Sequence, residues 1–156
     1  MPKKPSFDLA EAHRFFAADC FNRAWDLIEK QDRTPAEDRR MVALNQASLF
    51  HWMERPDVTD RNMSIGYWQA SRIQALIGEA AEARRYAEIC LGYSQDLEPF
   101  YLGYAHEALA RASLVAGDAT GARRSLAEAE QLASKVGRKD DRNLLRSDLE
   151  ALKSRL

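Results

Sequence analysis

"YWQASRIQALIGEAAEARRYAEIC" (residues 67–90) lies over "HEALARASLVAGDATGARRSLAEA" (residues 106–129) when Gly78 is placed on Gly117. Other coincident positions include Arg72 and Arg111, Ala83 and Ala122, Arg84 and Arg123, and Arg85 and Arg124. Each segment predicts a helix, a tight turn at its glycine, and a second helix whose inner positions are small. A helical hairpin cannot bury both of its faces alone, so the repetition predicts hairpins that stack on one another.

The chain before the repeat also has helical periodicity, and strand-like alternation of Val, Ile and Thr is almost absent. In the first helix, one apolar stripe is expected to comprise Leu9, His13, Phe16, Cys20, Ala24 and Leu27. A second helix should start with Thr34 as its cap, Pro35 in its first turn and Glu37 completing a capping box. Pro56 should end that helix near Arg55.

The remaining sequence predicts five further helices, which makes seven in all with no strand. Asp60 or Asn62 is expected to cap the third helix, Pro99 to begin the fifth, and Asp118 to cap the sixth. The expected fold is therefore a single all-α domain, and a plain irregular helical bundle is the alternative to stacked hairpins. Its parts are an N-terminal helical pair at 6–55, two hairpins at 63–136 and a C-terminal capping helix at 140–156.

Composition excludes several classes of function. The 156 residues carry 23 basic and 24 acidic side chains for a net charge of -1, which gives no basic footprint for nucleic acid or an anionic membrane. Two cysteines, Cys20 and Cys90, have no metal-like spacing and do not form a disulfide framework. We find neither a signal peptide nor a membrane-spanning run, so a cytoplasmic location is expected.

The two segments resemble the tetratricopeptide repeat family, which has an aromatic residue, Leu-Gly and a turn glycine, followed by Ala and Phe along the second helix. The corresponding residues are Tyr67, Ala70, Ser71, Gly78, Ala83, Ala87 and Cys90, then His106, Leu109, Ala110, Gly117, Ala122, Leu126 and Ala129. The resemblance covers about residues 63–136. It departs from the family in its period of 39 rather than about 34 residues, and in Gln95 and Ser134, which replace a helix-ending proline.

This resemblance implies a right-handed superhelical stack in which the first helix of each hairpin lines a concave face that binds a protein or peptide. The chain is also similar to a group of small bacterial helical-repeat proteins that share the order DRTP…HW…W…SR, here residues 32–35, 51–52, 68 and 71–72. This second resemblance implies a bacterial protein and transfers no site residue.

The concave positions that the repeat pattern implies hold a distinctive set of side chains. The candidate ligand-binding residues are Trp68, Arg72, Tyr104, Glu107 and Arg111, with His51 and Trp52 at the margin of the face. Two guanidiniums beside aromatic rings suit a peptide carboxylate, an acidic side chain or a phosphate, through bidentate hydrogen bonds. The alternative is that the two arginines form structural ion pairs with Glu107, Glu79 or Asp118.

Catalytic and metal-binding chemistry has little support in the sequence. None of His13, His51 and His106 pairs with another at the spacing of three or four that places two ligands on one helical face. His51 and Glu54 are three apart in the sequence, so a metal protein or enzyme that uses His51, Glu54 and His106 is the alternative function. We otherwise expect no catalytic residue and no cofactor.

The large aromatic residues outside the candidate face are expected to pack in the core. They are Trp25, Phe50, Trp52, Tyr67, Phe100 and Tyr101. Burying each would contribute about 1.5–3 kcal/mol, which a stack of short, alanine-rich helices needs. An open stack also has uncapped ends, so a purely structural homodimer that associates through the first two helices is a further alternative.

Overall fold

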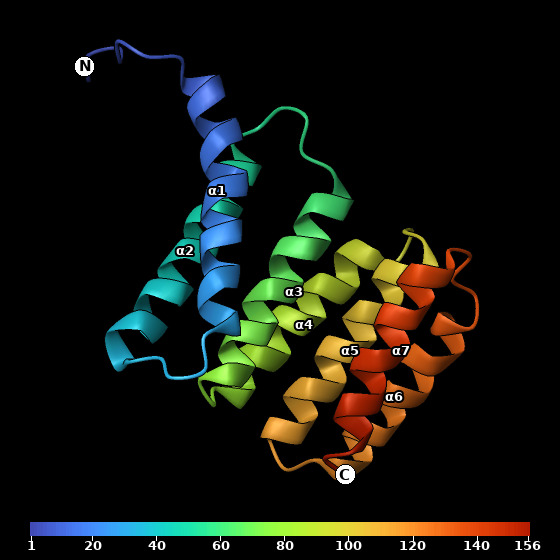
Figure 1. Ribbon diagram of the computed structural model, residues 1–156. Helices are drawn as coiled ribbons and strands as arrows, with labels where there is room; N and C mark the ends of the chain where they lie inside the picture. The colour runs from blue at the N-terminus through green and yellow to red at the C-terminus, as the bar shows by residue number, and fades with distance from the viewer. The chain divides into compact units, whose positions relative to one another are not determined.

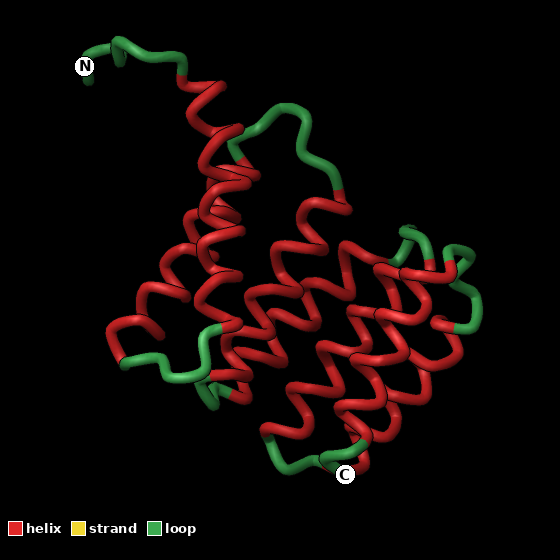
Figure 2. The backbone as a smooth tube through the Cα atoms, viewed as in Figure 1, coloured by secondary structure: helices red, strands yellow, loops and turns green.

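A computed structural model describes all residues, 1–156, as seven α-helices without a strand (Figure 1 and Figure 2), which confirms the predicted all-α class. The helices are α1 (Leu9–Glu29), α2 (Pro35–Met53), α3 (Asp60–Leu76), α4 (Ala80–Ser94), α5 (Pro99–Val115), α6 (Ala119–Ala133) and α7 (Lys139–Lys153). The chain divides into an N-terminal unit, residues 1–59, and a C-terminal unit, residues 60–156. None of the helices combines the length and the hydropathy that a membrane crossing requires.

The N-terminal unit is a hairpin of α1 and α2. Thr34 caps α2 as predicted: its side chain accepts from the Glu37 N–H at 3.2 Å, and the Glu37 carboxylate accepts from the Thr34 N–H at 2.9 Å. Ser48 on α2 donates to the Ala17 carbonyl of α1 at 2.7 Å, which joins the two helices inside the hairpin. The side chains buried between them are Ala17, Cys20, Ala24, Ile28, Met41, Asn45, Ser48 and Leu49.

Two expectations for the N-terminal unit are wrong. Leu9 and Phe16, assigned to the apolar stripe of α1, are 50% and 42% exposed, and Phe50, assigned to the core, is 54% exposed. A hairpin of two helices shares one seam, and the stripe that Ala17, Cys20 and Ala24 define is narrow because small side chains bring the helices close. Larger side chains beside that seam therefore stay in contact with solvent.

The C-terminal unit contains the predicted repeat in full. With Gly78 placed on Gly117, helix α3 coincides with α5 from its first residue to its last, and α4 coincides with α6 in the same way. The inner side chains of the second helices are buried at the same spacing. They are Ala83, Ala87, Cys90 and Ser94 on α4, and Ala122, Leu126, Ala129 and Ala133 on α6.

The two hairpin turns share one backbone geometry. Gly78 and Gly117 have positive φ angles of 84° and 74°, the left-handed region that glycine enters without a Cβ clash. In each turn the N–H that follows the glycine donates to the carbonyl five residues back, as in a Schellman motif. These bonds run from Glu79 to Gln74 and from Asp118 to Ser113, both at 2.9 Å. The repeat therefore extends from the sequence to the hydrogen-bonding pattern.

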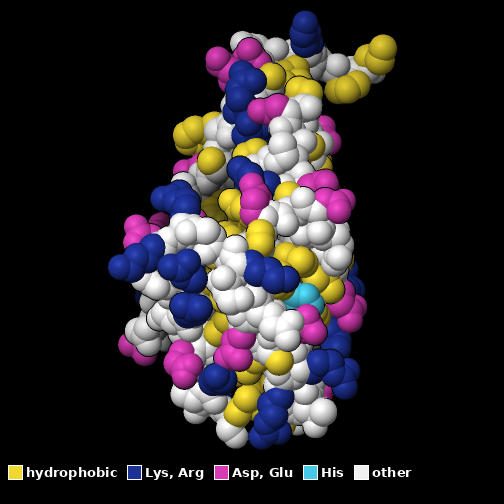
Figure 3. Space-filling view, turned by 90° about the vertical axis from the view of Figure 1, so that its right-hand side faces the viewer, with side chains coloured by type: hydrophobic (Ala, Val, Ile, Leu, Met, Phe, Trp, Pro, Cys, Tyr) yellow, Lys and Arg dark blue, Asp and Glu magenta, His cyan; other side chains and the backbone are white.

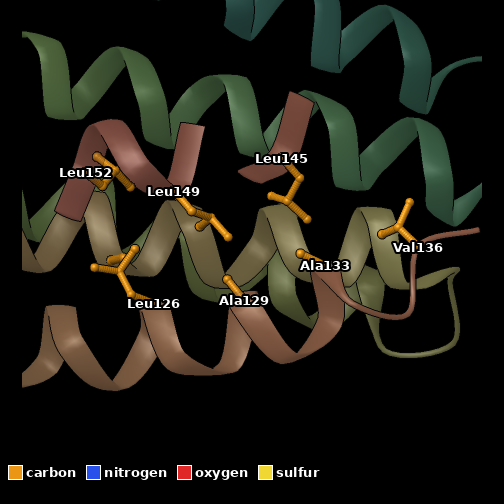
Figure 4. Close-up of a cluster of buried hydrophobic side chains, with 8 residues drawn as sticks. Leu126, Ala129, Ala133, Val136, Leu145, Leu149 and Leu152 are labelled. Carbon is orange, nitrogen blue, oxygen red and sulfur yellow. The ribbon is translucent and has the colours of Figure 1, made fainter. Parts of the chain in front are cut away.

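The C-terminal unit has two layers of helices. Helices α3, α5 and α7 form one layer, in which α5 contacts both of the others (Figure 1). Helices α4 and α6 form the other: α4 contacts both α3 and α5, and α6 contacts both α5 and α7. Leu145, Leu149 and Leu152 of α7 are buried against Leu126 and its neighbours on α6 (Figure 4). Helix α7 thus covers the α5–α6 hairpin where the first helix of a third hairpin would lie.

The helix starts in this unit follow the predictions except at α3. Pro99 begins α5 and the Asp118 carboxylate accepts from the Gly121 N–H at 2.8 Å, as expected. Asp60 and Asn62, the expected caps of α3, both lie inside the helix, because it begins at Asp60. An acid in the first turn still interacts favourably with the helix dipole, so Asp60 stabilises the start of α3 without capping it.

Candidate functional site

Helices α3 and α5 bring five of the seven predicted site residues together in the C-terminal unit. Trp68 and Arg72 lie one turn apart on α3, and Glu107 and Arg111 lie one turn apart on α5. Because α3 and α5 are equivalent helices of the repeat, Glu107 occupies on α5 the position that Trp68 occupies on α3. Tyr104 completes the set from the turn before Glu107. We call these five residues the α3/α5 cluster.

Glu107 is the centre of the α3/α5 cluster and is fully buried. Its carboxylate accepts from the indole N–H of Trp68 at 2.9 Å and from Nε of Arg111 at 3.1 Å. A buried carboxylate without partners would be very costly, so both donors are needed to hold the charge in place. Glu107 thereby joins its own helix to the preceding hairpin.

Tyr104 extends the cluster to α7. Its hydroxyl donates to the Asp148 carboxylate at 2.7 Å, and its ring meets Trp68 edge to face at 5.6 Å. Burial raises the pKa of Tyr104 well above its usual range, and the Asp148 carboxylate raises it further. Asp148 is therefore part of the site, and the sequence analysis missed it. No motif or spacing marks this residue among the 24 acids of the sequence.

Arg72 lies in the same polar neighbourhood and is half-buried. Its guanidinium carbon is 5.8 Å from the centre of the Trp68 ring, within the range of a cation–π contact. Burial lowers the pKa of Arg72, and the neighbouring Arg111 lowers it further, while the Glu107 and Asp148 carboxylates act against both. The surroundings of Arg72 therefore disfavour its charge, so an added negative group nearby would stabilise it.

Arg111 forms one of the structural ion pairs that the sequence offered as the alternative to ligand binding. Arg111 pairs with Glu107, and only 14% of its side chain is exposed. Asp118, another suggested partner, is occupied at the start of α6. Arg111 thus holds the cluster together through its pair with Glu107.

His51 and Trp52, the predicted margin of the site, belong to the N-terminal unit and have partners there. Nδ1 of His51 lies 2.9 Å from Nδ1 of His13 across the α1–α2 hairpin. Burial lowers the pKa of His51, His13 lowers it further, and Glu54 opposes both. The guanidinium of Arg55 stacks 4.2 Å from the centre of the Trp52 ring.

The residues of the metal or enzyme alternative do not form a ligand set. No group of three or more His, Cys, Asp or Glu side chains is placed so that it could hold a metal ion. His106 is half-buried on α5, where burial lowers its pKa and Glu128 opposes this. Burial raises the pKa of the Cys90 thiol to about 11. Burial also raises the pKa of the Cys20 thiol, so neither cysteine is a nucleophile near neutral pH.

The surface around these features carries mixed charge. On the face drawn in Figure 3, basic and acidic side chains alternate without a large area of one sign. A depression of about 600 Å³ lies between α6 and α7, and none of the predicted site residues lines it. Two acids, Glu130 and Glu150, and one base, Arg146, contribute to its wall.

Comparisons with protein-family models, with curated proteins and with solved structures gave no match to the chain. The resemblance to tetratricopeptide repeats therefore rests on the internal repeat of residues 63–136 alone.

Proposed function

We propose that the chain is a non-catalytic binding module of the tetratricopeptide type, whose α3/α5 layer binds a protein or peptide that carries an acidic group. The observation that carries this proposal is the position of Arg72. It is half-buried with its guanidinium against the Trp68 ring, and both burial and the nearby Arg111 disfavour its positive charge. A carboxylate from a partner would find a guanidinium whose fork geometry suits bidentate binding.

The remaining residues of the cluster supply rigidity and ring surface. Trp68 is held by Glu107, and Tyr104 is held by Asp148, so both aromatic rings have fixed orientations. Binding then costs little side-chain entropy, because the partner meets side chains that are already ordered. Aromatic rings and arginine are also the residue types that contribute most at protein interfaces.

The proposal is tested with a displayed library of short random peptides selected on the full chain. We expect selected peptides to carry an acidic residue or to need their terminal carboxylate. Arg72→Met keeps an apolar stem of similar length and removes the guanidinium, so it should weaken binding by at least about tenfold, which corresponds to ~1.4 kcal/mol.

Arg85→Met is the matched control for this experiment. Arg85 lies in the same unit, pairs with Glu82 and stacks on Tyr86 at 4.4 Å, but it is outside the cluster. Selected peptides should bind this variant as they bind the unmodified chain. Equal binding by the Arg72→Met and Arg85→Met variants would refute the assignment of the site.

Self-association through α1 and α2 is a second candidate function, favoured by the exposed phenylalanines of the N-terminal unit. Phe15 is 61% exposed and Phe50 is 54% exposed. A homodimer that buries both would lose affinity in a Phe15→Ser, Phe50→Ser double variant. Leu144→Ser is the control, since Leu144 is also 54% exposed but lies on α7. Sedimentation equilibrium distinguishes the outcomes, and a monomer at every concentration would exclude this function.

We also propose a cytoplasmic location, which both cysteines support. Cys20 and Cys90 are free and buried, and they lie in different units. A chain without disulfides suits a reducing compartment.

A further inference from the structure

His13 and His51 meet across the hairpin of the N-terminal unit. They come from α1 and α2, 38 residues apart, and their Nδ1 atoms are 2.9 Å from each other. The two rings are tilted by 52°, with their centres 5.1 Å apart. Both side chains are half-buried, so their nitrogens remain within reach of a small ion.

The separation of the two nitrogens matches a particular coordination geometry. A metal ion lies about 2.0–2.1 Å from an imidazole nitrogen, so two nitrogens 2.9 Å apart would subtend an angle of about 90° at the ion. A regular tetrahedral angle would instead need a separation of about 3.3 Å at the same bond length. Neighbouring ligands at a right angle are typical of tetragonal Cu²⁺ or Ni²⁺.

We propose that His13 and His51 form a two-histidine site for a divalent transition-metal ion, with Cu²⁺ the preferred occupant, that links α1 to α2. Cu²⁺ comes first because nitrogen ligands bind it more tightly than the other divalent ions of its row. Water would complete the coordination, since no third His, Cys, Asp or Glu stands in place.

Binding requires a change of tautomer and no net loss of a proton. The close contact between the two Nδ1 atoms places a proton on one of them. In the metal-bound state both Nδ1 atoms would donate lone pairs, and that proton would move to Nε2 of its own ring. Glu54, one turn beyond His51, is close enough to oppose the fall in the pKa of His51, and its negative charge would also favour a cation.

The site does not depend on the peptide-binding function, because all of its residues lie in the N-terminal unit. Aromatic rings flank it: Phe16 lies 5.4 Å from His51 between ring centres, and so does Phe50.

The test uses the full chain, titrated with Cu²⁺ near neutral pH in the presence of glycine, which competes for weak surface sites. The electron paramagnetic resonance spectrum of the bound copper counts the nitrogens in its plane. Two imidazole nitrogens are expected. The proposal would be overturned if the spectrum of the unmodified chain showed fewer than two imidazole nitrogens bound to copper. It would also be overturned if glycine alone held the copper.

Three variants assign the nitrogens to residues. His13→Gln and His51→Gln should each reduce the affinity for Cu²⁺ by at least about tenfold. His106→Gln is the control in the C-terminal unit and should bind Cu²⁺ as tightly as the unmodified chain. Circular dichroism shows whether each variant remains helical. A two-nitrogen spectrum that persists in both His13→Gln and His51→Gln would place the copper elsewhere and overturn the proposal.

Discussion

The two units of this chain solve the same problem, the burial of a helical hairpin, in different ways. In the C-terminal unit, equivalent positions of successive hairpins cover one another, and buried polar groups such as Glu107 find donors in the neighbouring repeat. The N-terminal unit has one hairpin and no repeat, and it holds seven of the ten large hydrophobic side chains that are exposed in the chain. Repetition therefore provides the cover that a single hairpin lacks.

The largest loss of stability should come from removing the Glu107 carboxylate, which joins the two repeats. Glu107→Ala leaves the Trp68 N–H and the Arg111 guanidinium without their acceptor in a buried place. Breaking a buried pair in this way costs about 3–5 kcal/mol. Urea unfolding followed by circular dichroism measures the loss, and Glu107→Gln should lose less because its amide oxygen still accepts.

Glu82→Ala is the control for that measurement, since Glu82 also pairs with an arginine but on an exposed face. It should leave the urea midpoint nearly unchanged. A midpoint for Glu107→Ala close to that of Glu82→Ala would show that the repeats do not depend on this contact.

A smaller effect is expected where α7 covers the second hairpin. A Cβ at Gly103 would lie 2.7 Å from Cδ2 of Leu145, so Gly103→Ala should destabilise the chain by about 1–3 kcal/mol through overpacking. The equivalent position in the first hairpin holds Ser64. Gly92→Ala on α4 is the control: a Cβ there meets nothing within 4 Å, and alanine favours the helix. Thermal unfolding of both variants measures the difference. Equal melting temperatures would contradict the close packing of Gly103 against Leu145.

Helix caps allow the two units to be compared at similar positions. Thr34→Ala in the N-terminal unit and Asp118→Ala in the C-terminal unit each remove one side-chain acceptor from a first turn. Each should cost about 0.5–2 kcal/mol. Amide hydrogen exchange is expected to speed up in the first turn of α2 in one variant and of α6 in the other. Faster exchange throughout the chain would mean that the units do not respond separately.

The smallest expected effect is a dependence of the stability of the N-terminal unit on pH. The pKa of His51 is lowered in the folded chain, so the unfolded chain binds protons more readily between that lowered value and the ordinary value of 6.5. Stability is therefore full above about pH 6.5 and falls as the pH drops below it. Exchange in α1 and α2 should accelerate at mildly acid pH, and His51→Gln should remove part of that acceleration. An identical pH profile in His51→Gln would show that His51 is not its source.

The architecture was accessible from the sequence because glycine spacing and inner alanines determine it. Gly78 and Gly117 mark turns that need a positive φ, and residues 67–90 and 106–129 repeat the pattern of small inner side chains. The single hairpin was harder to predict. Its burial depends on which neighbour lies beside each stripe, and periodicity does not contain that information.

The candidate site was only partly accessible. Repeat spacing brought Trp68 and Glu107 to equivalent positions, but it could not show that one donates to the other. Asp148 and the contact between His13 and His51 join segments 38 or more residues apart, with no spacing rule between them. Such pairs depend on tertiary packing, and only the folded chain reveals them.

The indole of Trp68 is a built-in fluorescent probe of how the two hairpins pack. Its N–H is bonded to a charge that belongs to the next hairpin, and its ring touches Tyr104 of that same hairpin. Any sliding of one hairpin past the other would change the electric field across the indole and with it the wavelength of its emission. In a chain whose Trp25 and Trp52 are replaced by Phe, ordinary fluorescence would therefore report how the stack flexes.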